Sequence, residues 1–255
     1  MKKLIRFVLS HVPRKYIQRV AHLVTPVLGI FYLGKKVECP ICGSHYRRFM
    51  PYGYVESREN ALCPRCMALE RHRLLWLYLQ RESDLFSSKK KVLHVAPERC
   101  FMQRIGSFIG KENYITADLE SPLATVKANI EELPFEDSSF DMIICNHILE
   151  HVDNDHKALA EIFRVLRPQG SAILMCPVNY EREVTYEDPT IVDELLREQH
   201  FGQKDHLREY GRDYPQRIAQ AGFKVDSIDY ITHLEQTEAV RYGLRSEIIY
   251  AGNKA

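Results

Sequence analysis

Four of the seven cysteines form two pairs with the spacing of metal-binding knuckles. Two residues separate Cys39 from Cys42 and Cys63 from Cys66, and 20 residues lie between the pairs. Zinc takes four thiolate or imidazole ligands, with sulfur at about 2.3 Å, and a closed set of four leaves no position for a reacting water. The spacing therefore predicts one structural Zn²⁺ ion, which stabilises a ribbon with little core of its own.

Four separately buried cysteines and a redox-active pair are the alternatives, and the doubled spacing favours the metal over both. Cys100, Cys145 and Cys176 have no partners at such spacing, so we expect them to be small buried apolar side chains. The odd number of cysteines and the paired motif indicate a reducing compartment rather than a secreted disulfide framework.

The composition is that of an ordinary globular protein, with 45% hydrophobic and 27% charged residues in a chain of 255. The 35 lysines and arginines balance 34 acidic residues, so the net charge does not indicate a strongly basic nucleic-acid binder. Residues 47–73 are locally basic, which leaves RNA contact there as an alternative. Interspersed glutamates and the lack of an aromatic stacking platform disfavour it.

The first 36 residues differ from the rest in charge and pattern. Eight basic residues and no acidic one precede Glu38. Apolar residues recur at helical spacing on both sides of Pro13, which predicts two basic amphipathic helices. The longest apolar stretch, 20–33, falls short of the roughly 20 residues that span a bilayer. We expect a cytoplasmic protein whose residues 1–33 contact the inner, anionic membrane face, or else pack on the rest of the chain.

From residue 92 onward, short apolar runs alternate with helical patterns, which predicts a parallel α/β sheet. The expected strands are 92–95, 114–117, 142–145, 172–176, 223–230 and 247–251. The clearest helices are 69–81 and 155–166, the latter stopped by the polar residues 167–170. The predicted parts are a helical segment 1–36, a zinc ribbon with its linking helix 37–88, and an α/β domain 89–255 with an inserted segment at about 180–215.

The stretch 129–152 reads NIEELPFEDSSFDMIICNHILEHV, and DNDHKALAEIFRVLRPQGSAIL follows it. Its LPF turn, SFD strand, LEHV segment and helix ending RVLRP resemble the class I methyltransferases that use S-adenosylmethionine, with Gln169 where a glycine is customary. The resemblance implies a Rossmann-like, mostly parallel sheet with an antiparallel last strand. A closer likeness is to small bacterial methyltransferase-like proteins with a zinc ribbon in front and an HVAPE first loop.

The resemblance also implies which residues hold the cofactor at the carboxyl ends of the strands. Asp118 stands where a carboxylate accepts the ribose hydroxyls, and Asn129 with Ile130 frames the adenine. Asn146 and His147 line the methionine and methyl end. The alternatives without a binding role are that Asp118 is a turn residue and that Glu150 and His151 are only the polar start of a helix.

The first loop departs from the wider family, because HVAPE replaces the usual glycine-rich turn. The resemblance places His94, Ala96 and Glu98 in the cofactor-binding set. Ala96 is small enough for close backbone approach, and Glu98 can attract the methionine amino group. Pro97 lacks an amide hydrogen and cannot donate one to the ligand.

The resulting hypothesis is methyl transfer from S-adenosylmethionine to an unidentified acceptor. Catalysis can come largely from holding donor and acceptor at attack distance. If the acceptor must lose a proton, His147, His200 and His206 are the candidate bases. The alternatives are a non-catalytic binding module on the same fold and an RNA methyltransferase whose ribbon recognises the nucleic acid.

Residues 200–211 are the predicted lid over the acceptor. They combine His200, His206 and Tyr210 with charged residues and two glycines that can serve as hinges. Long connections at the carboxyl edge of a sheet are often functional. A solvated helix with its charges facing water is the alternative.

Overall fold

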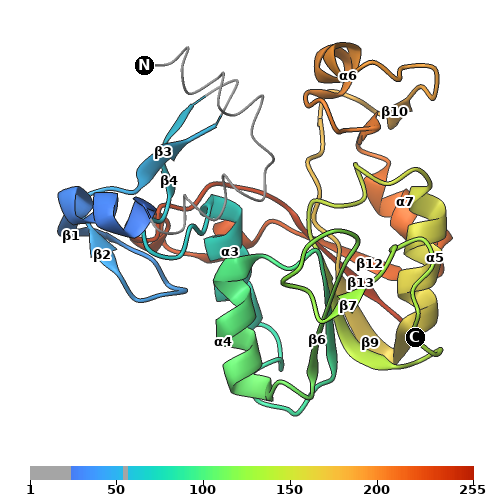
Figure 1. Ribbon diagram of the computed structural model, residues 1–255, viewed down its shortest axis with the longest axis horizontal. Helices are drawn as coiled ribbons and strands as arrows, with labels where there is room; N and C mark the ends of the chain where they lie inside the picture. Colours follow the sequence, from blue (N-terminus) through green and yellow to red (C-terminus); the bar gives the residue numbers. More distant parts are fainter. Residues whose placement is uncertain (1–23, 54–56) are drawn as a thin grey trace. The chain divides into compact units, whose positions relative to one another are not determined.

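The computed structural model describes residues 24–53 and 57–255 (Figure 1). The chain divides into two compact units. Met1–Glu82 with Tyr230–Glu247 forms the first, called here the cysteine unit. Ser83–Asp229 with Ile248–Ala255 forms the second, called here the sheet unit.

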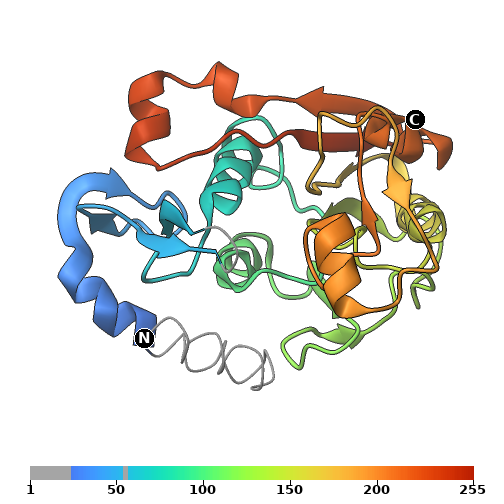
Figure 2. The same cartoon turned by 90° about the horizontal axis from the view of Figure 1, so that it is seen from above.

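A seven-stranded sheet organises the sheet unit, in the order β12-β13-β9-β8-β5-β6-β7. Its first five strands in sequence are mutually parallel, whereas β13 is antiparallel to both of its neighbours (Figures 1 and 2). This topology confirms the predicted Rossmann-like sheet with an antiparallel last strand. The strands are β5 (Val92–Val95), β6 (Tyr114–Asp118), β7 (Val126–Lys127), β8 (Phe140–Cys145), β9 (Leu166–Ile173), β12 (Lys224–Ile228) and β13 (Ile249–Asn253).

Three helices pack on this sheet: α4 (Arg99–Ile109), α5 (Asp155–Val165) and α7 (Tyr214–Gln220). The α5 helix begins where the Asn154 side chain accepts a hydrogen bond from the Lys157 amide, which satisfies one free N–H of the first turn. Its apolar face, spaced three and four residues apart, is buried in the main core with strands β8 and β9. The sequence periodicity therefore predicted the bounds of this helix to within one residue.

The strand after α5 differs from the prediction. Leu166 already has extended backbone angles and pairs with Phe140, so β9 begins at once and includes residues 167–170. Gln169 has a φ of +63°, the left-handed conformation in which a glycine costs least. Its amide donates to the Lys254 carbonyl, which holds this irregular backbone against the end of the chain.

The inserted segment contains β10 (Tyr186–Glu187), α6 (Glu194–Phe201) and β11 (Arg208–Glu209), with β10 antiparallel to β11. The Asp193 carboxylate caps α6 by accepting from the amides of Leu195 and Leu196. The Leu207 amide donates to the Glu150 carbonyl at 2.8 Å. Because Glu150 follows β8, this bond anchors the segment at the carboxyl edge of the sheet.

The cysteine unit consists of short elements. Residues 24–29 are helical, and η1 (Ile30–Tyr32), β1 (Leu33–Glu38), β2 (His45–Tyr46), β3 (Met50–Tyr52), β4 (Arg58–Leu62), α3 (Glu70–Arg81), η2 (Tyr230–His233) and α8 (Gln236–Arg241) complete it. The sequence analysis predicts that residues 230–247 belong to the α/β domain 89–255. In the structure, the buried Arg73 guanidinium donates to the carbonyls of Tyr242 and Gly243, at 2.7 Å each, and so attaches them to this unit.

Within the described ranges, no helix combines the length and apolarity needed to cross a bilayer. The two amphipathic helices are predicted within residues 1–36, of which residues 1–23 lie outside the described residues, whereas 24–29 are helical.

Candidate functional site

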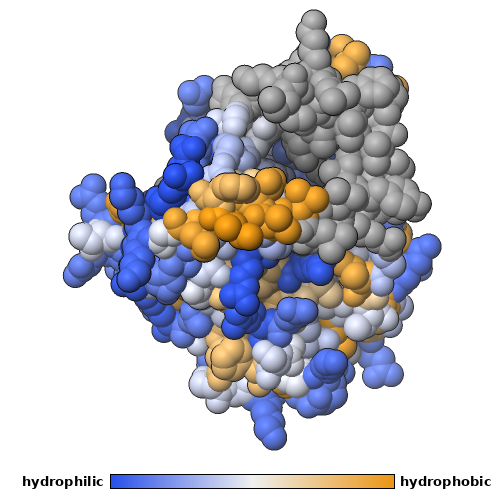
Figure 3. Space-filling model, turned by 60° about the vertical axis from the view of Figure 1, so that its left-hand side comes forward, coloured by the Kyte–Doolittle hydropathy of each residue, from blue (hydrophilic) through white to orange (hydrophobic). Residues whose placement is uncertain are grey.

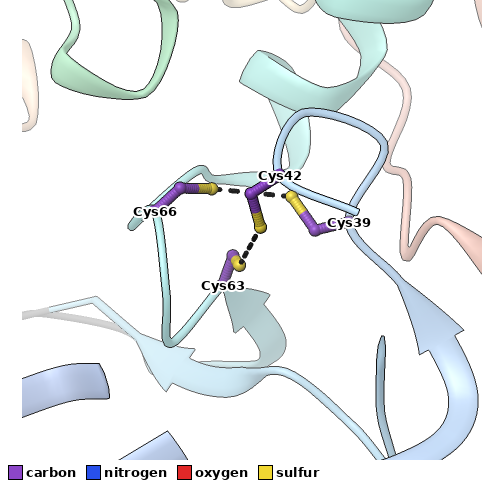
Figure 4. A group of neighbouring side chains, drawn as sticks. All are labelled: Cys39, Cys42, Cys63 and Cys66. Carbon is purple, nitrogen blue, oxygen red and sulfur yellow. Dashed lines mark hydrogen bonds between the residues drawn. The ribbon is translucent and has the colours of Figure 1, made fainter. Parts of the chain in front are cut away.

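The four paired cysteines come together, as Figure 4 shows. Their sulfurs lie within 4.8 Å of one another, and Cys39 Sγ is 3.6 Å from Cys66 Sγ while Cys42 Sγ is 3.7 Å from Cys63 Sγ. A tetrahedron with Zn–S bonds of about 2.3 Å has edges of about 3.8 Å. The donor set and its spacing therefore fit a tetrahedral Zn²⁺ ion. Hydrogen bonds with the other thiols, above all Cys39, raise the pKa of Cys66.

The two knuckles have the same backbone. The Gly43 amide donates to the Cys39 carbonyl and the Met67 amide to the Cys63 carbonyl, at 2.8 and 2.9 Å. Gly43 and Met67 both have positive φ, +68° and +59°. A methionine thus adopts in the second knuckle the conformation that a glycine adopts in the first, as expected for a loop that wraps the same ligand geometry twice.

The first loop of the sheet unit begins with a left-handed residue. Ala96 has a φ of +44°, so it replaces the missing glycine in conformation as well as in size. The buried His94 ring, just before it, lies 2.6 Å from both Tyr114 Oη and Glu98 Oε2. Burial raises the pKa of Tyr114, so the phenol donates to His94 Nδ1, and His94 Nε2–H donates to Glu98. Tyr114, which the sequence analysis did not single out, thereby helps orient the Glu98 carboxylate.

Asn146, at the end of β8, continues this chain of polar groups. Its Nδ2 donates to Glu98 Oε1 at 3.2 Å. Its Oδ1 is buried and accepts no hydrogen bond from the described residues. An unsatisfied buried acceptor beside a carboxylate is suited to a cationic donor such as an ammonium group.

Asp118 and Asn129 both close turns. Asp118 Oδ1 accepts from the amides of Glu120 and Ser121, at 2.8 and 2.7 Å, which leaves Oδ2 for a ligand. Asn129 Oδ1 accepts from the Glu131 amide at 3.0 Å. Ile130 is 5% exposed and belongs to the main core. The turn alternative for Asp118 is thus realised at one oxygen, without excluding the ribose role at the other.

His147 and the buried Glu150 follow β8. His147 has a φ of +53°, a conformation that costs a non-glycine residue free energy and is often found at functional sites. Its Nδ1 lies 3.4 Å from Glu150 Oε1. Although burial opposes ionisation, the interaction with His147 and the nearby charge of His151 lower the pKa of Glu150.

The three residues of the predicted lid have different surroundings. His206 is 5% exposed and packs edge-on against His151, with ring centroids 4.8 Å apart, and burial lowers its pKa. His200 is exposed on α6, with its Nδ1 3.4 Å from Tyr186 Oη. Tyr210 is 1% exposed, and its hydroxyl donates within the core to Leu149 and Asp155. Of the three, only His206 packs against a histidine of the segment after β8, a contact that sequence spacing could not indicate.

The basic region 47–73 is not a uniform surface. Arg73 is fully buried and is held by four carbonyls, and Arg58 pairs with Glu70 at 3.0 Å. Both cations therefore stabilise the cysteine unit instead of facing a polyanion. This distribution removes part of the basis for the RNA alternative.

The family model described as a methyltransferase domain matches residues 91–174, about a third of the chain. A ubiquinone/menaquinone biosynthesis C-methyltransferase of Brucella anthropi is 44% identical over 62 residues, 24% of each chain. The chain thus spans about a quarter of the length of the curated relatives it matches. These findings support a methyltransferase domain of the S-adenosylmethionine-dependent class in the sheet unit.

Two solved structures are similar at a lower level. The YcgJ protein of Bacillus subtilis shares 18% identity, with a TM-score of 0.45 over 72% of this chain and 98% of that one. A Burkholderia thailandensis 1,6-didemethyltoxoflavin-N1-methyltransferase with bound S-adenosylhomocysteine shares 16%, with a TM-score of 0.46 over 71% and 76%.

Proposed function

We propose that the sheet unit binds S-adenosylmethionine and transfers its methyl group to an acceptor not yet identified. The observation that supports this most directly is the polar cluster at the carboxyl ends of β5 and β8, within the residues that match the methyltransferase domain. Glu98 and the buried Asn146 Oδ1 are two acceptors for the ammonium of the methionine moiety. Asp118 Oδ2 is an acceptor for a ribose hydroxyl. When bound, the cofactor supplies an activated sulfonium methyl.

The residues of the chain would then act mainly by positioning. The left-handed Ala96 lets the backbone approach the ligand, and the His94–Glu98 hydrogen bond holds the carboxylate in place. His147 and His206 remain the candidate bases because both lie at Glu150, whereas His200 contacts Tyr186. Residues 180–215 would close over the acceptor. In this proposal the buried Tyr210 side chain fixes the segment to the core of the sheet unit.

Calorimetric titration with S-adenosylmethionine and S-adenosylhomocysteine tests the proposal. Asp118→Asn keeps the Oδ1 that closes the turn but replaces the charged Oδ2, so we expect binding to weaken by about 1–3 kcal/mol. Asp137→Ala is the control, since that carboxylate is 76% exposed and pairs with Arg164 on the surface. No binding of either ligand by the wild-type chain at millimolar concentration would favour the non-catalytic alternative. An equal loss in both variants would indicate general destabilisation.

We also propose that the four cysteines bind a structural Zn²⁺ ion, supported by sulfur spacings close to a tetrahedral edge. All four positions of the ion would be filled, so it would stabilise the fold and take no part in methyl transfer. Cys63→Ser should lower the zinc content measured by elemental analysis. Unchanged stoichiometry in that variant would refute the assignment.

A peripheral contact with anionic membrane is a third proposal. Six apolar side chains at the start of the described chain are 40–71% exposed: Val24, Val27, Leu28, Ile30, Phe31 and Leu33. Figure 3 shows an exposed hydrophobic patch, coloured orange, at the centre of this face of the molecule. Exposed lysines of β1, Lys35 and Lys36, follow these residues in sequence. Directly after β2, the exposed Arg47 and Arg48 have guanidinium groups within 6 Å of the Tyr32 ring. An apolar patch with a basic rim complements an anionic lipid surface.

Sedimentation of the full chain with vesicles tests this contact. We expect binding to anionic vesicles at low salt and none to zwitterionic ones. Lys35→Glu should weaken binding, because each basic side chain near the surface contributes about 1 kcal/mol. Lys204→Glu, an exposed change in the sheet unit, should have little effect. Failure of the wild-type chain to sediment with anionic vesicles would contradict the proposal.

A further inference from the structure

A second group of potential metal ligands lies in the sheet unit. Glu150, His151 and His206 each offer a ligand atom, and these three atoms lie within 4.8 Å of one another. Two segments supply them: the turn after β8, and the connection between α6 and β11. The hydrogen bond from the Leu207 amide to the Glu150 carbonyl, at 2.8 Å, holds the two segments together. The cluster is therefore fixed by the backbone as well as by side-chain packing.

The hydrogen bonds of the two histidines leave the same ring nitrogen available. His151 Nδ1 lies 2.9 Å from the Asp205 carbonyl oxygen, and His206 Nδ1 lies 3.1 Å from the Phe201 carbonyl oxygen. A carbonyl oxygen only accepts, so Nδ1 carries the hydrogen in each ring and the neutral ring has its lone pair on Nε2. Histidines that bind metals have this arrangement, with the second nitrogen donating to a carbonyl or carboxylate.

One oxygen of the Glu150 carboxylate has no hydrogen-bond donor among the described residues. Glu150 is 1% exposed, and its Oε2 accepts no hydrogen bond from any described residue. Its other oxygen, Oε1, lies 3.4 Å from His147 Nδ1 and 4.0 Å from His151 Nε2. A buried carboxylate oxygen without a donor is costly, and a bound cation would remove that cost.

We infer that Glu150, His151 and His206 bind a divalent first-row transition-metal ion, separate from the ion proposed at the four cysteines. With His206 Nε2 on this ion, His147 is the remaining candidate base. Two imidazole nitrogens and one carboxylate form a ligand set of catalytic zinc and non-haem iron sites, which retain positions for another ligand. Bonds of about 2.0–2.2 Å require ligand atoms closer together than 4.8 Å, so the side chains must draw inward around the ion.

The ligand that such an ion would take is an oxygen of the methyl acceptor. This part of the inference depends on the proposed methyltransferase function, whereas binding of the ion does not. His147 Nδ1 lies 3.4 Å from Glu150 Oε1, and His147 directly follows Asn146, a residue of the proposed cofactor site. The ion would therefore lie next to the cofactor site, where the methyl acceptor would bind. A hydroxyl or enol oxygen bound to a divalent cation loses its proton more easily.

Cobalt(II) titration of the untagged full chain, carrying its zinc, tests the site. Cobalt bound to thiolate shows an intense charge-transfer absorption, whereas cobalt bound to nitrogen and oxygen shows only weak visible bands. We expect one equivalent of Co²⁺ without the thiolate band, and at least tenfold weaker binding in Glu150→Gln and His206→Ala. His200→Ala is the matched control, because it removes an exposed histidine of the same segment.

His151→Ala guards against misfolding of the buried variants, because this side chain is 31% exposed. It should also lower Co²⁺ affinity at least tenfold while the near-ultraviolet circular dichroism stays unchanged. The inference is overturned if the wild-type chain binds no Co²⁺ outside the cysteines, or if a folded His151→Ala binds it as tightly as wild type. Calorimetry with S-adenosylmethionine is a separate readout, so failure of the metal site and failure of the methyltransferase proposal are distinguishable.

Discussion

Non-glycine residues with positive φ mark two positions where methyltransferase-like sequences usually have glycine. Ala96 and Gln169 have φ of +44° and +63°. Their surroundings differ. Ala96 lies in the proposed cofactor loop, where a strained backbone would allow the ligand to approach closely. Gln169 is an exposed residue in the first half of β9. Gln169 is not one of the proposed cofactor-binding residues, so we expect its backbone strain to reduce stability without a role in binding.

Gln169→Gly should raise the free energy of unfolding by about 0.5–1 kcal/mol. The left-handed conformation costs a residue with a Cβ about 1–2 kcal/mol, and the greater freedom of glycine in the unfolded chain offsets part of the gain. Chemical denaturation measures the change. Gln220→Gly is the matched control, since Gln220 ends α7 and glycine should destabilise that helix. A loss of stability in Gln169→Gly would show that the glutamine side chain contributes more than its backbone strain costs.

At the scale of elements, the buried carboxylate of Asp155 joins α5 to α7. Its oxygens receive Arg217 at 2.8 and 3.0 Å and the Tyr210 hydroxyl at 2.9 Å. Burial favours the neutral acid, but the interactions with Arg217 and Arg208 prevail and lower the pKa of Asp155 below its ordinary 3.8. A group whose pKa falls on folding stabilises the protein above its unfolded pKa, and that stability disappears as the pH falls through the folded pKa.

Asp155→Asn should therefore cost about 3 kcal/mol near neutral pH, because it leaves buried arginine charge uncompensated. It should also flatten the dependence of stability on pH below about pH 4, where wild type loses this contribution. Denaturation at a series of pH values measures both effects. If the variant retains the steep acid dependence of wild type, other carboxylates cause it.

The strands could be predicted where burial is continuous and the helices where apolar residues recur every three or four positions. β5 matches the predicted 92–95 in full, and α5 differs from the prediction by one residue. The start of β9 could not be predicted, because Arg167, Pro168 and Gln169 are typical of a turn. Its pairing with β8 and the contact with Lys254 decide the backbone there.

The candidate site was predictable where the ligands are close in sequence. The cysteine spacing predicts a cluster of four sulfurs, and the structure brings them within 4.8 Å of one another. The cofactor roles of Glu98, Asp118 and Asn146 stay predictions. The contact of His206 with His151 depends on how the inserted segment returns to β8, which no local pattern encodes. Tyr210 illustrates the reverse case: a tyrosine in a predicted lid is, in the fold, a buried partner of Asp155.

At the scale of the whole molecule, the chain builds two units with different sources of stability. The sheet unit has a large continuous core. The cysteine unit buries the apolar cluster of Ala61, Leu62 and Leu69, and it also buries apolar side chains of α3 such as Leu74 and Trp76. The cysteine unit also uses Arg73, whose four hydrogen bonds to carbonyls link β4, the second knuckle and residues 242–243. Binding of the proposed Zn²⁺ ion would add its free energy to the folding of this unit.

Cys63→Ser in the full chain should consequently increase amide hydrogen exchange through residues 37–81. Amides of β5 and β8 should keep their protection, because the core of the sheet unit contains none of the four paired cysteines. Hydrogen exchange with mass-spectrometric readout measures both regions at once. Cys100→Ser is a control that changes a cysteine of the sheet unit. Equal loss of protection throughout the Cys63→Ser chain would show that the two units unfold together.

Native mass spectrometry of the full chain, as purified and after addition of S-adenosylmethionine, tests the central claim most directly. The account predicts a species that exceeds the mass of the polypeptide by its bound metal and by one molecule of S-adenosylmethionine or S-adenosylhomocysteine. Asp118→Asn should reduce this adduct and Asp137→Ala should retain it. A folded, metal-containing chain that takes up neither nucleoside at millimolar concentration would contradict the account.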